Sequence, residues 1–234
     1  MSKKCKIKFC GMKDNNALGF AVSLGVNYLG FIVDFPKSPR NISIDEFNKK
    51  IKWLRKTHQG NYKVVAVTVD MPLNKLEYLM EEGMADIMQL HGNEHFSICR
   101  QVKSQMETWK AISQKHKKSN EEILTLAKSV DRVVLDSGNA VEKAFNTSGA
   151  FNDMELYNLL VNEGINVVLS GGINAGNVKE YLEKYEPSVI DISRGIESEP
   201  GVKSKPKMQE LIDAVNQFYS FGETFERRKN DEEE

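Results

Sequence analysis

The sequence predicts a parallel α/β fold. Eight short apolar runs recur along its 234 residues, and a segment with helical periodicity follows each of them. Several runs lack polar alternation, which is typical of strands buried on both faces of a parallel sheet. Eight such units in a chain of this length favour a closed (βα)8 barrel, the TIM barrel, over an open doubly wound sheet, although the pattern alone is compatible with both.

The predicted strands are short segments rich in apolar and β-branched residues. They are Lys6–Cys10, Tyr28–Val33, Val64–Val69, Ile87–Leu90, Thr108–Ile112, Arg132–Leu135, Val167–Leu169 and Val189–Ile192.

The predicted helices carry apolar residues on one face, as Ala17, Phe20 and Leu24 do in the first of them. They are Asn15–Leu24, Ile44–Leu54, Leu73–Met80, Phe96–Val102, Glu121–Lys128, Met154–Val161, Val178–Tyr185 and Met208–Phe218.

Start and stop signals agree with these helices. Asp14, Ser43 and Ser119 are predicted N-caps, and a glutamate lies three residues after each serine, as in a capping box. Glycines follow four of the helical runs and are predicted to end them: Gly25, Gly60, Gly83 and Gly164.

Residues 1–221 are predicted to form one barrel domain, because no linker interrupts them. Residues 222–234 (GETFERRKNDEEE) are highly charged and lack an apolar face, which predicts a disordered C-terminal tail. Ser137–Asn152 is a long connection after the sixth strand, and long loops in compact domains are usually functional lids or disordered segments.

The composition argues against several classes of protein. The net charge is −1 and the pI about 6.5, so we expect no nucleic-acid partner. Three cysteines, Cys5, Cys10 and Cys99, match no zinc-ligand spacing, which predicts no metal site and a reducing compartment. We find no secretory signal and no apolar run long enough for a membrane span, and we therefore expect a cytoplasmic protein without a membrane partner.

Reactive side chains fall at the predicted strand ends, where the active sites of α/β barrels lie. Cys10 ends the first strand, His91 the fourth and Asp136 the sixth, while Arg40 lies in the loop after the second. Each residue also has an ordinary structural interpretation. These are a core cysteine, a hydrogen-bonded histidine, a turn cap and an exposed loop arginine.

Cys10 and Asp136 are a candidate base and acid. A thiolate can act as a base near neutral pH if neighbouring charges lower its pKa. A carboxyl group can act as a general acid if burial raises its pKa. Arg40 could hold a carboxylate through two parallel hydrogen bonds.

Two glycine-bearing loops predict a phosphate site. Gly171 and Gly172 follow the seventh strand, and Ser193, Arg194 and Gly195 follow the eighth. The loops after these two strands of a barrel often bind phosphate through backbone N–H groups and a helix N-terminus. Glycine allows close approach of the backbone to an anion, although it also simply makes tight turns.

Short motifs occur in a fixed order at these strand ends. They are Lys8-Phe9-Cys10-Gly11, Gly30-Phe31 with Ser38-Pro39-Arg40, Gln89-Leu90-His91-Gly92-Asn93-Glu94, Leu135-Asp136, Leu169-Ser170-Gly171-Gly172-Ile173 with Asn177-Val178, and Asp191-Ile192-Ser193-Arg194-Gly195-Ile196-Glu197 with Pro200-Gly201-Val202-Lys203. In this order they resemble the phosphoribosylanthranilate isomerase family of tryptophan biosynthesis, over roughly residues 6–204.

The resemblance implies a (βα)8 barrel enzyme that needs no metal or cofactor and occurs as a monomer or homodimer. Its reaction is the Amadori rearrangement of N-(5-phosphoribosyl)anthranilate to 1-(2-carboxyphenylamino)-1-deoxyribulose 5-phosphate. By the same resemblance, Asp136 protonates the ribose ring oxygen and opens the ring to a Schiff base, and the Cys10 thiolate removes the C2′ proton.

The resemblance also implies how the substrate is held. Arg40 would bind the anthranilate carboxylate, and the loops after strands seven and eight would bind the phosphate. Further candidate substrate contacts are His91, Gly149 and Asp191.

The sequence departs from the family pattern in two loops. The G-T-G element expected after strand six is only partly present in Phe145–Ala150, which includes Gly149. Arg194 replaces the second serine of S-S-G, and it could reach the phosphate or point to solvent.

Two alternatives remain at this stage. The related isomerase of histidine biosynthesis typically has a carboxylate at the position of Cys10 and needs a second phosphate site, for which the sequence shows no second glycine-rich loop. A non-catalytic phosphosugar-binding barrel would have no need of an acid–base pair.

Overall fold

The computed structural model describes residues 4–113, 118–137 and 153–232 of the chain, with side chains placed up to residue 220. Eight parallel strands form the central sheet. They are β1 (Lys6–Cys10), β2 (Tyr28–Val33), β4 (Lys63–Thr68), β5 (Ile87–Leu90), β6 (Glu107–Ser113), β7 (Arg132–Asp136), β8 (Val167–Ser170) and β9 (Val189–Ile192).

The sheet is closed. Each of these strands pairs in parallel with the next along the chain, and β1 pairs with both β2 and β9. The two-residue strand β3 (Asn41–Ile42) adds to the end of β2. Closure confirms the predicted (βα)8 barrel and excludes the open doubly wound sheet.

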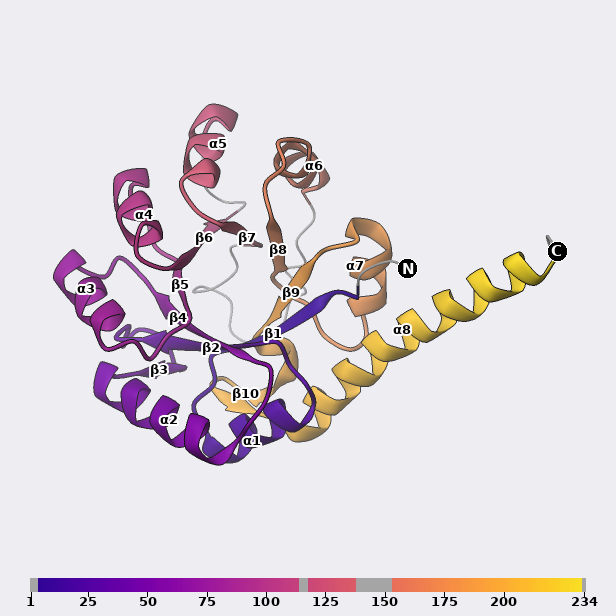
Figure 1. The fold of residues 1–234 in the computed structure, drawn as a ribbon, viewed down its shortest axis with the longest axis horizontal. Coiled ribbons are helices and arrows are strands. Elements are labelled where there is room, and N and C mark those ends of the chain that lie inside the picture. Colours follow the sequence, from indigo (N-terminus) through magenta and orange to yellow (C-terminus); the bar gives the residue numbers. More distant parts are fainter. Residues whose placement is uncertain (1–3, 114–117, 138–152, 233–234) are drawn as a thin grey trace.

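Helices surround the barrel, and Figure 1 shows α1 to α7 arranged around the strands. They are α1 (Asn15–Ser23), α2 (Ile44–Thr57), α3 (Leu73–Glu81), α4 (Phe96–Lys103), α5 (Asn120–Lys128), α6 (Met154–Asn162), α7 (Val178–Tyr185) and α8 (Lys205–Glu232). Among the helices that the structure describes, none combines the length and apolar character needed to cross a membrane.

The predicted helix starts are confirmed in detail. Asp14 accepts a hydrogen bond from the backbone of Ala17, and Ser43 and Ser119 each form a complete capping box. Three of the four predicted stop glycines adopt positive φ after their helices, namely Gly25, Gly83 and Gly164. Gly60 does not end its helix, because α2 stops at Thr57 and the chain turns extended already at His58.

The last helix is longer than the sequence pattern predicts. It continues to Glu232, and Figure 1 shows it leaving the barrel toward the C-terminus. The predicted boundary between a barrel and a charged tail at residue 221 therefore falls inside α8 and stays a prediction. Of the long connection predicted after the sixth barrel strand, only Ser137 lies within the described residues.

The strands separate two apolar regions because alternate side chains point to opposite faces. One set packs against the helices in the main core. The other set fills the barrel with a smaller cluster that includes Tyr28, Trp109, Val134 and Val168. Cys10, the last residue of β1, also belongs to this cluster. Because these side chains fill the barrel, a substrate cannot enter its interior, and the rim at the strand ends is the candidate binding region.

Candidate active site

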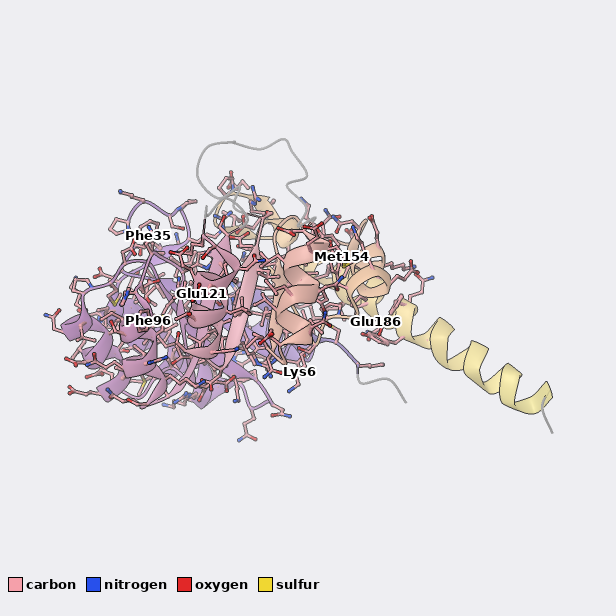
Figure 2. The ribbon with its side chains drawn as sticks, turned by 90° about the horizontal axis from the view of Figure 1, so that it is seen from above. Lys6, Phe35, Phe96, Glu121, Met154 and Glu186 are labelled. Carbon is pink, nitrogen blue, oxygen red and sulfur yellow. The ribbon has the colours of Figure 1, made fainter. Side chains whose placement is uncertain are left out.

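The candidate residues meet at the rim where the strands end. Figure 2 shows the barrel from the side, with Lys6, at the start of β1, toward one edge. Phe35, which follows β2, and Met154, which begins α6, lie toward the opposite edge. Parallel pairing therefore places the ends of β1, β5, β7, β8 and β9 on one face of the molecule.

Cys10 lies beside a buried ion pair. The fully buried Lys8, two residues earlier on β1, donates to Asp191 Oδ2 at 2.7 Å. The absence of a side chain at Gly30 provides the space: a Cβ there would lie 3.0 Å from Cys10 Sγ and 3.1 Å from Lys8 Nζ. The thiol and the ammonium group therefore occupy the same small region.

The charges around Cys10 act in opposite directions. Burial raises the pKa of the Cys10 thiol, the positive charges of Lys8 and Lys203 lower it, and the charge of Asp191 raises it again. The pKa as a whole lies above the usual value, so the thiol is protonated at neutral pH when no ligand is bound.

Only one of the two carboxylate oxygens of Asp191 accepts a hydrogen bond from a described residue. Its Oδ2 accepts from Lys8, whereas its buried Oδ1 has no hydrogen-bond partner among the described residues. A buried polar atom without a partner requires an explanation, and a bound hydroxyl group would satisfy it.

His91 and Asp136 lie within reach of each other. His91 Nε2 is 3.3 Å from Asp136 Oδ2, and Gln89 Nε2 is 3.0 Å from His91 Nδ1. If the Gln89 amide donates to Nδ1, the imidazole carries its proton on Nε2 and donates it to Asp136. The predicted catalytic acid thus has a histidine as its neighbour.

Arg40 is already paired in this structure. Its Nε and Nη2 donate to Glu197 Oε1 and Oε2 at 2.8 and 2.6 Å, a two-bond contact that ties the loop after β2 to strand β10 (Glu197–Glu199). A two-bond grip on a substrate carboxylate, as expected from the sequence, would therefore have to use the other edge of the guanidinium group, which includes Nη1.

Glu197 also binds a second cation. Lys203, in strand β11 (Val202–Lys203), donates to Glu197 Oε1 at 2.8 Å and to the Ser193 carbonyl at 3.0 Å. Burial pushes the pKa of Glu197 up, but Arg40 and Lys203 outweigh it and leave that pKa below its usual value. The cluster of Arg40, Glu197 and Lys203 carries one net positive charge, which suits an anionic ligand.

The two glycine loops pack closely together. Gly171 and Gly172 have φ values of +97° and +71°, and a Cβ on Gly171 would lie 2.8 Å from the backbone nitrogen of Ser137. A Cβ on Gly195 would overlap the backbone of Ile173. The ends of β7, β8 and β9 therefore approach one another as only glycine allows.

Side chains also fix the first of these loops. Tyr181 donates to the Gly171 carbonyl at 3.2 Å and Asn177 donates to the Gly172 carbonyl at 2.9 Å. Ser193 precedes a short 3₁₀ helix, Arg194–Ile196, in which Arg194 is exposed. Gly149, the remaining candidate contact, lies outside the described residues.

Sequence reasoning gave no role to several partners of the candidate residues. Lys8, Gln89, Glu197 and Lys203 all stand within the recognised motifs, yet their pairing was not predicted. The available signal was a polar residue inside an otherwise apolar strand, as in KIKFC and IMQL. Among the described residues, no three histidine, cysteine, aspartate or glutamate side chains are grouped as metal ligands would be.

A closed α/β barrel that brings a cysteine, a histidine and an aspartate together with two glycine loops at its carboxyl rim has the arrangement of a barrel enzyme, whose active site lies at this rim. The profile of the N-(5′-phosphoribosyl)anthranilate (PRA) isomerase family matches residues 7–214. The chain belongs to this family. It is an isomerase of tryptophan biosynthesis that catalyses an Amadori rearrangement, so the family suggested by the motifs is confirmed.

Individual relatives agree with this assignment. The chain is 36% identical over 215 residues to N-(5′-phosphoribosyl)anthranilate isomerase of Sinorhizobium fredii, covering 91% of this chain and 93% of the relative. The crystal structure of phosphoribosylanthranilate isomerase from Thermus thermophilus is 26% identical and superposes with a TM-score of 0.74 over 91% of this chain and 98% of that one.

A third relative shows a ligand. A phosphoribosylanthranilate isomerase solved in complex with reduced 1-(o-carboxyphenylamino)-1-deoxyribulose 5-phosphate is 24% identical, with a TM-score of 0.72 over 91% of this chain and 99% of that one. At this identity the likeness shows a common fold.

Proposed function

We propose that Cys10 is the general base and Asp136 the general acid of the isomerisation. The observation that carries this assignment is their placement at the ends of β1 and β7, each beside a group that can tune it: Lys8 for the thiol and His91 for the carboxyl group. Both groups are side chains that transfer protons, as the reaction requires.

The steps balance without an added reactant. Protonated Asp136 gives its proton to the ribose ring oxygen, and the C1′–O bond breaks as the substrate nitrogen forms an iminium ion. The Cys10 thiolate then takes the C2′ proton, and the electron pair of the C2′–H bond neutralises the iminium to give an enolamine. Asp136 recovers a proton from the 2′-hydroxyl as the ketone forms, and the Cys10 thiol returns its proton to C1′.

The two anionic ends of the substrate are held by different loops of the rim. Arg40 binds the anthranilate carboxylate, which neutralises the net charge of its cluster with Glu197 and Lys203. The loops at Gly171–Gly172 and Ser193–Gly195 bind the phosphate. Asp191 Oδ1, His91 and Gly149 are further contacts, of which Asp191 would accept a ribose hydroxyl.

The proposal also covers the cellular compartment and the partners of the enzyme. We place it in the cytoplasm, because its three cysteines are free and buried and form no disulfide. We expect a monomer or homodimer that acts on a phosphoribosyl compound, with no nucleic-acid partner.

The test follows the loss of substrate fluorescence as enzymatically generated phosphoribosylanthranilate is consumed. Cys10→Ser and Asp136→Asn should each lower kcat by about 10²- to 10⁴-fold, the usual contribution of a general base or acid. Cys99→Ser, at a buried cysteine of α4, and Asp131→Asn, at the other end of β7, are matched controls. Retention of wild-type kcat by either catalytic variant would contradict the assignment of that residue.

A further inference from the structure

Lys110 and Glu94 form a buried ion pair that none of these chemical steps uses. Trp109 and Ala111, the neighbours of Lys110 on β6, point into the barrel, so Lys110 points away from it. Lys110 Nζ is 2.9 Å from Glu94 Oε2, and the two side chains are 3% and 4% exposed. Burying two charges is costly unless further hydrogen bonds compensate, so the other partners of this pair are informative.

The ammonium group of Lys110 binds the backbone on both sides of His91. It donates to the carbonyl of Leu90 at 3.2 Å and to that of Gly92 at 2.7 Å. A third contact, at 3.0 Å, goes to the Ala111 carbonyl on its own strand. Lys110 thus connects β6 to the carbonyl groups of the residues before and after His91.

Glu94 binds the same backbone segment, residues 90–92, through an N–H group. Both of its oxygens accept from the Gly92 N–H at 3.0 Å, and Oε1 also accepts from the Asp70 N–H at 3.0 Å. The N–H group of His91 itself donates to the Thr68 carbonyl at 2.8 Å. The backbone of residues 90–92 is therefore held from β4 and β6 at once.

The side chain of His91 points from this fixed backbone to the catalytic side of the rim, where Nε2 lies 3.3 Å from Asp136. We propose that Lys110 and Glu94 are positioning residues that hold His91 at hydrogen-bond distance from Asp136 without touching the substrate. The inference rests on the proposed role of Asp136 as the general acid.

A double-mutant cycle tests the inference. Lys110→Met and Glu94→Gln are each measured alone and combined with His91→Ala, with kcat/KM from the fluorescence assay as the readout. Each single variant should lower kcat/KM by about 10- to 100-fold, by analogy with the loss seen when a residue that orients a metal-binding side chain is removed. In the His91→Ala background the same changes should lower kcat/KM less than about 2-fold, because the group they position is absent.

A matched control lies at the opposite end of β5. Arg55 donates to the Met84 carbonyl at 3.0 Å and to Asp86 at 3.2 Å, so Arg55→Met also removes a cation that binds a loop, far from the rim. It should lower kcat/KM less than about 2-fold in either background. Glu94→Gln keeps the shape of the side chain, and it decides the result if Lys110→Met fails to fold.

Equal losses of kcat/KM with and without His91 would overturn the inference, since they would show that the pair only stabilises the fold. Wild-type kcat/KM in His91→Ala, or in Glu94→Gln at full folding, would overturn it as well. The proposed function fails separately, if Cys10→Ser or Asp136→Asn stays active.

Discussion

Cys10 lies where burial and charge oppose each other, and this decides how the reactivity of its thiol should depend on pH. Because its pKa is raised, the thiolate is the minor form at pH 7. As long as the pH is below that pKa, the thiolate fraction rises about tenfold for each unit of increase in pH. Alkylation of the thiol needs only the thiolate and no general acid, so its rate follows the ionisation of Cys10 alone. We therefore expect the rate of Cys10 alkylation to increase from pH 6 through 8, with a slope of about one on a logarithmic scale.

Lys8 should set the position of this rise. In Lys8→Met/Asp191→Asn the buried pair is replaced by neutral groups, so Asp191 is not left as an unpaired charge. Because the charge of Lys8 affects the thiol more strongly than that of Asp191, its loss should move the rising limb to higher pH. The rate of Cys10 alkylation against pH measures this shift.

Cys5 serves as the internal reference, because burial raises its pKa to about 12 and it stays protonated throughout this range. An unchanged rising limb in the double variant would show that Lys8 does not tune the thiol.

At the level of secondary-structure elements, the hairpin of β10 and β11 connects the two anion-binding parts of the rim. Glu197 binds Arg40, and Lys203 binds both Glu197 and the Ser193 carbonyl. Gly201, at φ +84°, lies so close to the loop of Arg40 that a Cβ would be 2.6 Å from the Pro39 carbonyl oxygen. The hairpin thus orients the arginine that the substrate carboxylate needs.

Glu197→Gln should therefore weaken substrate binding more than it slows the chemistry. The amide keeps the shape of the side chain but loses one charge-assisted hydrogen bond to Arg40, worth about 1.5–3 kcal/mol. We expect KM to rise about 10-fold or more, with a smaller change in kcat. Glu199→Gln, on the exposed part of the same hairpin, is the control. A fall in kcat at constant KM would contradict the orienting role.

The fold was predictable where local pattern and long-range structure agree. β1, β2, β5 and β9 match the predicted runs residue for residue, because a strand buried on both faces is a continuous apolar segment. β3, β10 and β11 were not predicted, since two or three residues carry no period. The extension of α8 was missed because residues 222–234 are mostly charged and contain a single large apolar residue, Phe225.

Of the candidate site, the sequence predicts only the residues that stand at the ends of predicted strands. The topology places Cys10, His91 and Asp136 on one rim once the strands are assigned. Their partners depend on contacts between distant positions: Lys8 and Asp191 lie 183 residues apart, and Arg40 and Glu197 lie 157 apart. No spacing rule links such pairs in a single sequence.

At the scale of the whole molecule, the stability of the barrel depends on the part of α8 that packs against it. The first part of α8 covers the barrel with four buried side chains, Met208, Leu211, Ile212 and Val215. The Tyr219 hydroxyl accepts a hydrogen bond from the Cys5 backbone at 2.9 Å, which fastens the helix beside the start of β1. All of these contacts precede residue 222.

Removal of residues 222–234 should therefore leave kcat, KM and the melting temperature unchanged within a few degrees. Removal of residues 208–234 should unfold the protein, because burial of the four apolar side chains contributes roughly 6–12 kcal/mol, about as much as the whole stability of a typical domain. Thermal unfolding followed by circular dichroism measures both truncations. A large loss of stability in the shorter truncation would show that the end of α8 belongs to the folded domain, and would move its boundary from residue 221 toward Glu232.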